Sequence, residues 1–228
     1  REESPHVEEM SEYAIVTVSM GAGIQSLFES LGAKIVIEGG QTMNPSTQDI
    51  TDAIAKANAK KVFILPNNKN IVMAAEQAAE MADVEAQVIA TESIPQGISA
   101  ILAFNPGADM KINYESMTEA MADVRTGQVT YAVRDTKING MTIQKGNFMG
   151  IANGHIQASH PDKMETVKNL LTELITDDDE ILTIIYGEDV TDEEANNLSQ
   201  YVEETFEDIE LELFKGEQPI YSYIISVE

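Results

Sequence analysis

The chain has 228 residues and a formal net charge of −25 at pH 7, because 39 Asp and Glu outnumber 14 Lys and Arg. This length is enough for one large domain or two small ones, each with a hydrophobic core. Proteins that bind nucleic acids or anionic lipid surfaces need a basic surface, so the charge argues against both classes. The absence of cysteine excludes disulfides, thiolate zinc sites and cysteine nucleophiles.

The sequence shows no targeting or membrane segment. No apolar run is long enough to span a bilayer, and the first residues do not resemble a signal peptide. Together with the lack of cysteine, this predicts a cytoplasmic protein. Residues 1–12 begin without Met and are predicted to be a linker, so we expect a fragment of a longer protein.

In the first half, short apolar segments alternate with helical patterns. Segments rich in β-branched residues predict four strands, at residues 13–18, 34–37, 61–65 and 86–90. Apolar residues at helical spacing predict five helices, at residues 24–31, 46–57, 71–82, 95–104 and 114–124. This alternation predicts an α/β, Rossmann-like subdomain over residues 13–125, with a parallel sheet covered by helices on both faces.

The second half has a different pattern. Residues 129–133 alternate between apolar and polar, and Asn139-Gly140 is a strong hairpin signal. Further strands and helices are predicted at residues 164–175 (helix), 180–186 (strand), 191–206 (helix), 209–214 (strand) and 220–227 (strand). We therefore expect an α+β subdomain with antiparallel pairing over residues 126–228.

Small polar residues follow each predicted strand of the parallel sheet. In an open parallel sheet, ligands bind beyond the carboxyl ends of the strands, where these loops converge. Backbone amides at the helix starts favour an anion or an oxygen-rich group there. The candidate ligand-binding residues are Gly21, Gly23, Gly39, Gly40, Gln41, Thr42, Ser46, Asn67, Asn68, Lys69, Asn70 and Thr91.

Each of these residues also has a structural explanation. Glycine serves tight turns, and Asn, Ser and Thr cap helices. The functional interpretation depends on their concentration at one edge of the sheet. The backbone angles of these glycines would distinguish two reasons for their presence. A positive φ indicates chain reversal, and a negative φ indicates close backbone approach.

Other chemical motifs are weak or missing. Gly21 and Gly23 after a strand, with Glu38 ending the next strand, partly match a dinucleotide site, but Ser26 stands where that motif needs a small Gly or Ala. No Walker A motif, Ser-hydrolase elbow or EF-hand loop is present. His155 and His160 without Cys are a weak metal signal, so we predict no metal site.

The acidity is concentrated near the carboxyl terminus. Residues 177–228 contain 17 Asp and Glu and one base, Lys215, which gives a local net charge of −16. One interpretation is a solvated acidic surface; the other is a docking face for a basic partner. The candidate docking residues lie on one predicted helix: Glu193, Glu194, Glu203 and Glu204.

Several segments together resemble a known family. Residues 18–28, 38–47 and 65–71 read VSMGAGIQSLF, EGGQTMNPST and LPNNKNI. Two later segments, TKINGM from residue 136 and KGNFMG from residue 145, fit the same family. This ordered set resembles the C-terminal domain of the bacterial fatty acid kinase ATP-binding subunit over nearly the whole chain.

The resemblance implies a longer parent protein and a partner. The parent would carry a dihydroxyacetone-kinase-type domain elsewhere, with the ATP and magnesium sites, and could be homodimeric. This segment would have a DegV-like fold, which is also the fold of the fatty-acid-binding partner. The partner presents a fatty acid, and the kinase converts it to an acyl phosphate for phospholipid synthesis.

The resemblance also bears on lipid binding. In DegV-like proteins the lipid carboxylate sits at loops corresponding to residues 39–47 and 66–70. The first loop here reads GGQTMNPS and has no equivalent of the Thr-Ser pair that grips the carboxylate. The sequence thus favours a non-catalytic docking domain without cofactor. A small-ligand or fatty-acid carrier and a nucleotide-dependent enzyme are the alternatives.

Overall fold

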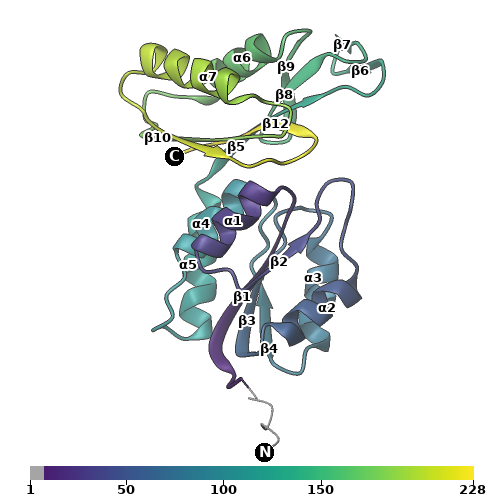
Figure 1. Ribbon diagram of the computed structural model, residues 1–228, viewed down its shortest axis with the longest axis vertical. Helices are drawn as coiled ribbons and strands as arrows, with labels where there is room; N and C mark the ends of the chain where they lie inside the picture. Colours follow the sequence, from purple (N-terminus) through teal and green to yellow (C-terminus); the bar gives the residue numbers. More distant parts are fainter. Residues whose placement is uncertain (1–7) are drawn as a thin grey trace, which may run out of the picture. The chain divides into compact units, whose positions relative to one another are not determined.

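The computed structural model describes residues 8–228, which form two compact units (Figure 1). The first unit contains the described residues up to Ser19 together with Phe28–Ala120, and the second contains Met20–Leu27 and Met121–Glu228. The sequence places the division between residues 125 and 126. The structure places it at Met121 and adds Met20–Leu27 to the second unit.

The predicted linker is only partly observable. Residues 1–7 of the predicted segment 1–12 lie outside the described residues. The first strand, β1 (Ser11–Ser19), already includes residues 11 and 12, because its pairing with the next strand of the sheet starts at Ser11 opposite Ala59.

The first unit is built on a four-stranded parallel sheet. The strand order is β2-β1-β3-β4, and all three pairings are parallel. Besides β1, the strands are β2 (Ile35–Glu38), β3 (Ala59–Leu65) and β4 (Glu85–Val88). The central strands are apolar on both sides because β3 buries Val62, Phe63 and Ile64 completely, which is typical of a sheet covered on both faces.

Helices cover the two faces of this sheet. On one face, α2 (Thr47–Lys56) and α3 (Val72–Met81) pack against alternate residues of β1 and β3. The other face carries α4 (Ile94–Leu102) and α5 (Met110–Ala122) (Figure 1). The predicted α/β class and the parallel sheet are confirmed.

The second unit contains a six-stranded mixed sheet in the order β11-β10-β12-β5-β8-β9. Its strands are β5 (Arg125–Tyr131), β8 (Phe148–Ala152), β9 (His155–His160), β10 (Ile181–Tyr186), β11 (Glu210–Lys215) and β12 (Tyr221–Val227). Four of its five pairings are antiparallel, so the predicted antiparallel pairing is confirmed. The exception is β11, which pairs in parallel with β10 and not with β12, its neighbour in sequence.

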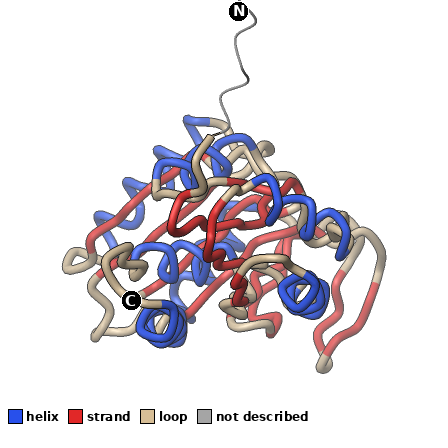
Figure 2. Tube along the Cα trace, turned by 90° about the horizontal axis from the view of Figure 1, so that it is seen from below, coloured by secondary structure: helices blue, strands red, loops and turns tan. Residues whose placement is uncertain are grey.

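One face of this sheet packs against two helices. α6 (Lys163–Leu174) and α7 (Asp192–Thr205) bury Leu170, Leu198 and Val202 against the sheet (Figure 1). The helix α7 connects the parallel pair β10 and β11, which explains why that pair is parallel. Figure 2 colours the helices and strands of both units along the chain trace.

A small two-stranded hairpin, β6 (Thr136–Ile138) and β7 (Met141–Ile143), leaves the main sheet after β5. Its turn, Asn139-Gly140, has φ values of 51° and 80°, as a type I′ turn requires. The predicted hairpin is therefore confirmed. A second turn of this kind, Asn153-Gly154 with φ of 50° and 83°, joins β8 to β9.

The remaining helix, α1 (Ala22–Ser30), ends at Gly32, whose φ of 109° is the left-handed conformation of a helix C-cap. Gly32 and Ala33 donate backbone hydrogen bonds to Glu29 and Phe28, which closes the end of the helix. Among residues 8–228, no helix is long and apolar enough to cross a lipid bilayer.

Candidate functional site

The loops at the carboxyl edge of the first sheet contact one another. They follow β2, β3 and β4, which lie in one parallel sheet, so their first residues meet at the same edge. Asn68 Nδ2 donates a hydrogen bond to Gln41 Oε1 over 3.4 Å, and the Asn67 backbone amide donates to Thr91 Oγ1 over 3.0 Å. The structure therefore brings these candidate residues of the first unit together.

Asn67 lies at the centre of this edge and is buried, with 7% of its surface exposed. Its Nδ2 donates to Thr17 Oγ1 (2.7 Å) and to the Val18 carbonyl (2.9 Å). Its Oδ1 accepts a hydrogen bond from Thr91 Oγ1 (2.9 Å). Both amide protons and one acceptor of the side chain are thus bound within the protein.

Gly97 shows how closely the chain surrounds this amide. A Cβ atom at Gly97 would lie 2.2 Å from Asn67 Oδ1, closer than atoms can approach without a shift. Asn67 itself has a φ of 58°, a left-handed conformation that Asn tolerates better than most residues. The side chains of Asn67, Thr17 and Thr91 therefore stabilise the loop and do not point into an open site.

The other candidate residues of the first unit lie nearer the surface. Gln41, Thr42, Lys69 and Asn70 are exposed. Gly39 is buried, and a Cβ there would lie 2.8 Å from the Met43 carbonyl, so close approach explains this glycine.

Gly40 and Met43 form an isolated bridge that closes the loop after β2, since each donates its amide to the other's carbonyl.

At two helices of this edge, α2 and α4, a side chain accepts one amide of the first turn, whereas α3 has no side-chain cap. Ser46 caps α2 through a capping box with Asp49, and the Ser93 hydroxyl accepts a hydrogen bond from the Gln96 amide at the start of α4. These caps are the structural alternative considered for such residues. At α2 and α4 the caps therefore satisfy one amide of the first turn, and the anion site expected at this edge stays a prediction.

Gly21 and Gly23 belong to the second unit, where α1 begins. The Gly216 carbonyl accepts hydrogen bonds from the amides of Gly23 (3.0 Å) and Ile24 (3.1 Å). A Cβ at Gly23 would lie 1.9 Å from the Lys215 carbonyl oxygen. The expectation that this helix start binds an anion is therefore wrong for α1, since a backbone carbonyl occupies the position.

Gly21 and Gly23 are required to be glycine for different structural reasons. Gly21 has a φ of 97°, which reverses the chain before α1. Gly23 has no positive φ and is required by close backbone approach. The partial dinucleotide motif is thus explained by the packing of α1 against the loop after β11.

The four acidic candidates on α7 are not equivalent. Glu193, Glu203 and Glu204 are exposed. Glu194 is half-buried; its Oε2 accepts the Thr191 amide (2.8 Å) in a capping box, and its Oε1 lies 3.6 Å from Lys163 Nζ. Glu193, Glu203 and Glu204 thus form an acidic surface, whereas Glu194 also caps α7 and pairs with Lys163; the docking role of the four residues stays a prediction.

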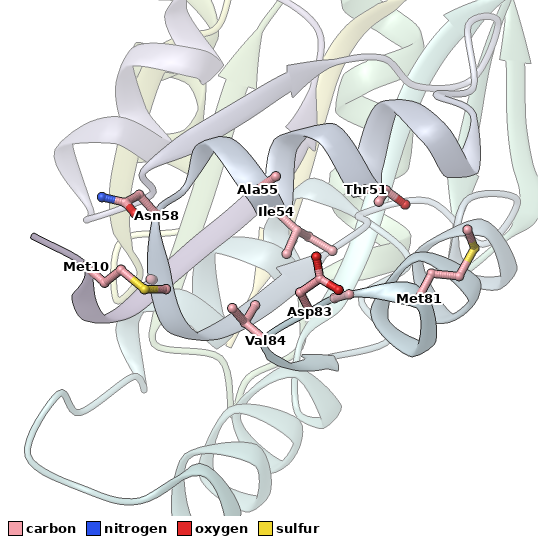
Figure 3. Close-up of a pocket in the computed structure, with 10 residues that line it drawn as sticks. Met10, Thr51, Ile54, Ala55, Asn58, Met81, Asp83 and Val84 are labelled. Atoms are coloured by element: carbon pink, nitrogen blue, oxygen red, sulfur yellow. The ribbon is translucent and has the colours of Figure 1, made fainter. Parts of the chain in front are cut away.

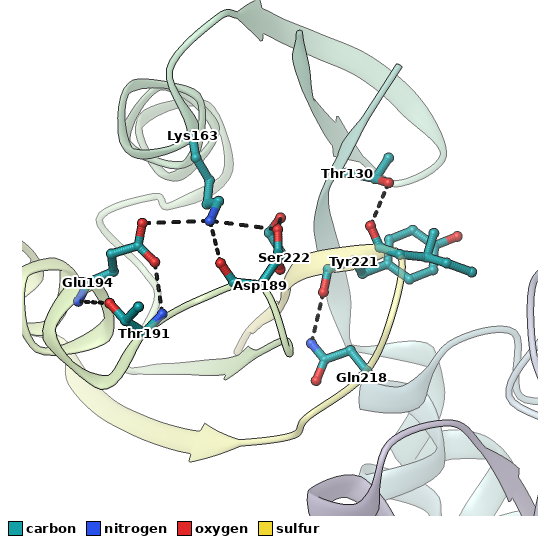
Figure 4. Close-up of polar contacts among 9 residues, drawn as sticks. Thr130, Lys163, Asp189, Thr191, Glu194, Gln218, Tyr221 and Ser222 are labelled. Atoms are coloured by element: carbon teal, nitrogen blue, oxygen red, sulfur yellow. Dashed lines mark hydrogen bonds and ion pairs between the residues drawn. The ribbon is translucent and has the colours of Figure 1, made fainter. Parts of the chain in front are cut away.

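Lys163 connects α6 to the loop before α7, a role for which the sequence carries no signal (Figure 4). Its Nζ donates to the Asp189 carbonyl (2.6 Å) and lies 3.6 Å from Asp189 Oδ2, which also accepts a hydrogen bond from Ser222 Oγ (2.6 Å). Beneath this cluster Tyr223 is fully buried, and burial with the nearby charges of Glu194 and Asp189 raises the pKa of its hydroxyl.

A separate hollow of about 130 Å³ lies at the opposite end of the first sheet (Figure 3). It is formed where β3 and β4 begin, with Ile54 and Val84 among its lining residues and Met10 and Met81 at its rim. Ligand pockets usually enclose about 300–1,000 Å³, so this hollow is too small for a fatty acid.

His155 and His160 are the first and last residues of β9. His155 is exposed, and His160 Nδ1 accepts a hydrogen bond from the Asp162 amide (2.9 Å). Within residues 8–228, no group of three or more His, Cys, Asp or Glu side chains is placed to hold a metal ion.

Comparison with known proteins identifies relatives over most of the chain. Residues 14–228 match the family model for the C-terminal domain of FakA-like fatty acid kinase subunits. The protein YloV of Bacillus subtilis is 54% identical over 216 residues, which cover 95% of this chain and 39% of that protein. The chain thus spans about two fifths of the length of this relative.

Solved structures share the fold at low identity. A DegV family protein, Cg2579 of Corynebacterium glutamicum, has a TM-score of 0.70 and 15% identity, covering 95% of this chain and 97% of that chain. The Fak B3 protein of Streptococcus pneumoniae, loaded with linoleic acid, has a TM-score of 0.62 and 12% identity, covering 95% and 99%. At such identities the likeness establishes the DegV-like fold.

Proposed function

Because the chain belongs to the C-terminal family of FakA-like fatty acid kinase subunits, we propose that it is the docking domain for a fatty-acid-loaded, DegV-like binding protein. The kinase domain, with its ATP and magnesium sites, would lie elsewhere in the longer protein. It would phosphorylate the presented fatty acid to an acyl phosphate for phospholipid synthesis in the cytoplasm. This chain would hold the partner and take no part in the chemistry.

One observation carries the choice of docking over lipid binding. The chain has the fold of fatty-acid-binding proteins, yet the polar side chains at its carboxyl edge are bonded to each other. Asn67, Thr17 and Thr91 would have to give up these bonds to hold a carboxylate. Breaking bonds to buried polar groups costs about 1–3 kcal/mol for each group left unpaired, which opposes a carrier function.

The acidic surface of α7 is the proposed contact for the partner. Glu193, Glu203 and Glu204 are exposed there, and residues 177–228 have a net charge of −16. Clustered charge of one sign steers a partner of opposite charge and raises the association rate. We therefore expect the docked partner to present basic residues to α7.

The test is a transfer experiment with labelled lipid. The 228-residue chain is mixed with a DegV-like fatty-acid-binding protein loaded with radioactive oleate, and the complex is isolated by size-exclusion chromatography. The proposal expects a complex in which the label stays with the binding protein after the two proteins are separated again. Transfer of the label to this chain would establish the carrier alternative, and the absence of any complex would overturn docking.

A further inference from the structure

The second unit has an unusual distribution of charge. Residues 126–160 contain three bases and one acid, a local net charge of +2 in a chain of net charge −25. Residues 177–228 of the same unit have a net charge of −16. The three bases fall between Arg134 and Lys145, on and beside the separate hairpin of β6 and β7, whereas the acids lie in and around β10, α7 and β11.

The bases lie on and beside the hairpin formed by β6 and β7, at the end of the unit next to β8 and β9 (Figure 1). Arg134, Lys137 and Lys145 are all exposed. The single acid, Asp135, uses Oδ1 to accept the Lys145 backbone amide (2.8 Å). The positive charges of the hairpin are therefore not paired with an acid of the hairpin itself.

Exposed apolar side chains lie in the same segment. Val133 is 71% exposed, Tyr131 is 45% exposed and Ile138 is 39% exposed. Such side chains add apolar contact area where a partner covers this segment.

The hairpin is held in a defined conformation. The turn Asn139-Gly140 has the two positive φ values that a tight hairpin requires, and Thr136 pairs with Ile143, which is fully buried. At its base, the Ala132 amide donates to the Asn147 carbonyl (2.8 Å). A preorganised element loses less conformational entropy on binding than a flexible loop does.

From this geometry we propose that the hairpin Thr136–Ile143, with Arg134 and Lys145 at its base, is a second docking element that binds an acidic, partly apolar protein surface. The inference rests on the proposed function, because it names the loaded fatty-acid-binding protein as the partner. A basic hairpin and an acidic surface on the same unit fix the orientation of a docked partner, whereas a surface of one sign does not.

The charge of the unit also favours a protein as the partner, and not a nucleic acid or an anionic membrane. A nucleic acid or an anionic membrane extends well beyond a short hairpin and would meet the acidic remainder of the unit. A folded protein can offer carboxylates to the hairpin and bases to α7 at the same time. Lys137 would then contact the acidic part of that protein surface, and Val133 its apolar part.

The experiment changes the hairpin charges in the 228-residue chain. The variant Arg134→Glu, Lys137→Glu, Lys145→Glu is measured against oleate-loaded binding protein by biolayer interferometry, and we expect the affinity to fall about tenfold or more. A neutral version with Gln at the same three positions should lose less. It also provides a folded reference in case the Glu variant melts at a lower temperature.

The control variant makes the same charge change elsewhere. Lys34, Lys56 and Lys111 are exposed residues of the first unit, and their replacement by Glu should leave the affinity within about twofold. Val133→Ser and Met73→Ser form a second matched pair, since both native side chains are 71% exposed. Of these two substitutions, only Val133→Ser should weaken binding to the loaded protein.

The outcomes separate this inference from the function on which it rests. If the unaltered chain does not bind the loaded protein, the proposed function and the inference both fail. If the unaltered chain binds and the hairpin and control variants bind equally well, docking stands and the hairpin has no part in it. A hairpin variant that changes only the chain's own oligomeric state in light scattering would also overturn the inference, because the hairpin would then contact a second copy.

Discussion

Asn67 holds the carboxyl edge of the first sheet through its side chain and its backbone together. Its amide connects β1, through Thr17 and Val18, to the segment after β4, through Thr91. The left-handed φ of 58° aims the side chain inward. No other polar candidate at this edge makes as many bonds among the described residues.

Replacing Asn67 with Ala should therefore destabilise the chain by about 2–4 kcal/mol. The variant loses three side-chain hydrogen bonds, leaves buried partners unpaired and places Ala at a positive φ. Urea unfolding followed by circular dichroism measures the change. Asn70→Ala, at an exposed position in the same loop, should change stability by less than about 0.5 kcal/mol, and an equal loss in both variants would contradict this role.

A second residue-scale prediction concerns Gly23. An Ala there would place its Cβ 1.9 Å from the Lys215 carbonyl oxygen, which is backbone and cannot rotate away. We expect Gly23→Ala to destabilise the chain by about 1–3 kcal/mol, because α1 must move from the loop after β11.

Gly107→Ala is the matched control for that substitution. Gly107 is exposed, has no positive φ and would bring its Cβ only to 3.3 Å from the Asn105 side chain. The control should unfold at nearly the same urea concentration as the unaltered chain. A Gly23→Ala variant as stable as this control would show that close approach does not require glycine.

At the scale of elements, Arg125 and Asp179 join the start of β5 to the loop before β10. The two side chains form an ion pair, and Arg125 Nη1 also donates to the Leu174 carbonyl (3.2 Å) at the end of α6. Burial raises the pKa of Asp179, but hydrogen bonds from the Thr176 amide and Arg125 lower it by more. The pKa of Asp179 therefore lies below its ordinary value.

This pKa shift gives a prediction for the pH dependence of stability. A carboxyl whose pKa is lower in the folded state stabilises the fold fully above its unfolded pKa of about 3.9, and the gain is lost as the pH falls through its folded pKa. Asp179→Asn should cost about 2 kcal/mol at pH 7 and progressively less in acid.

Unfolding in urea at pH 7, 5, 4 and 3 measures this difference. Asp178→Asn is the control, because the adjacent Asp178 is exposed. If the Asp179→Asn variant lost the same stability at every pH, its effect would come from packing or hydrogen-bond geometry and not from charge.

Local patterns predicted most elements because each pattern reflects burial within one element. The four strands of the first sheet, the hairpin turn at Asn139-Gly140 and the cap at Gly32 were all predictable from spacing and turn chemistry. The pairing of β11 with β10 was not, because it depends on α7 carrying the chain over the sheet and bringing β11 back parallel to β10.

The site was less predictable than the fold. The predicted clustering at one sheet edge correctly places Asn67 and Thr91 together. It does not predict the direction in which their polar groups point. That direction depends on Thr17 and Gly97, which lie far away in sequence. The ion pair of Lys163 with Glu194 likewise depends on how α6 and α7 pack, so the helix pattern alone did not predict it.

At the scale of the whole molecule, charge determines how the chain meets a partner. The excess of acids repels other copies of the chain and other acidic proteins, which opposes nonspecific contacts. Specific docking then depends on local patches, whose fields extend over the Debye length of the solution. Salt concentration therefore separates steering by a patch from short-range contact.

The last prediction uses this dependence to test α7. The variant Glu193→Lys, Glu203→Lys, Glu204→Lys reverses the exposed charges and keeps Glu194, which the fold needs. Between 0.01 M and 0.1 M salt the Debye length falls from about 30 Å to about 10 Å. In stopped-flow measurements the unaltered chain should associate with the loaded partner more slowly as salt rises, while its dissociation rate changes little.

The reversed variant should associate more slowly at low salt and lose most of that salt dependence, because the attraction it removes is the one that salt screens. The matched control replaces Glu76, Glu80 and Glu119, exposed acids of the first unit, with Lys. Both variants change the net charge equally, so a general effect of charge would slow them alike. An α7 variant that associates at the control's rate, with the control's salt slope, would remove α7 from the docking surface and leave the basic hairpin as its proposed centre.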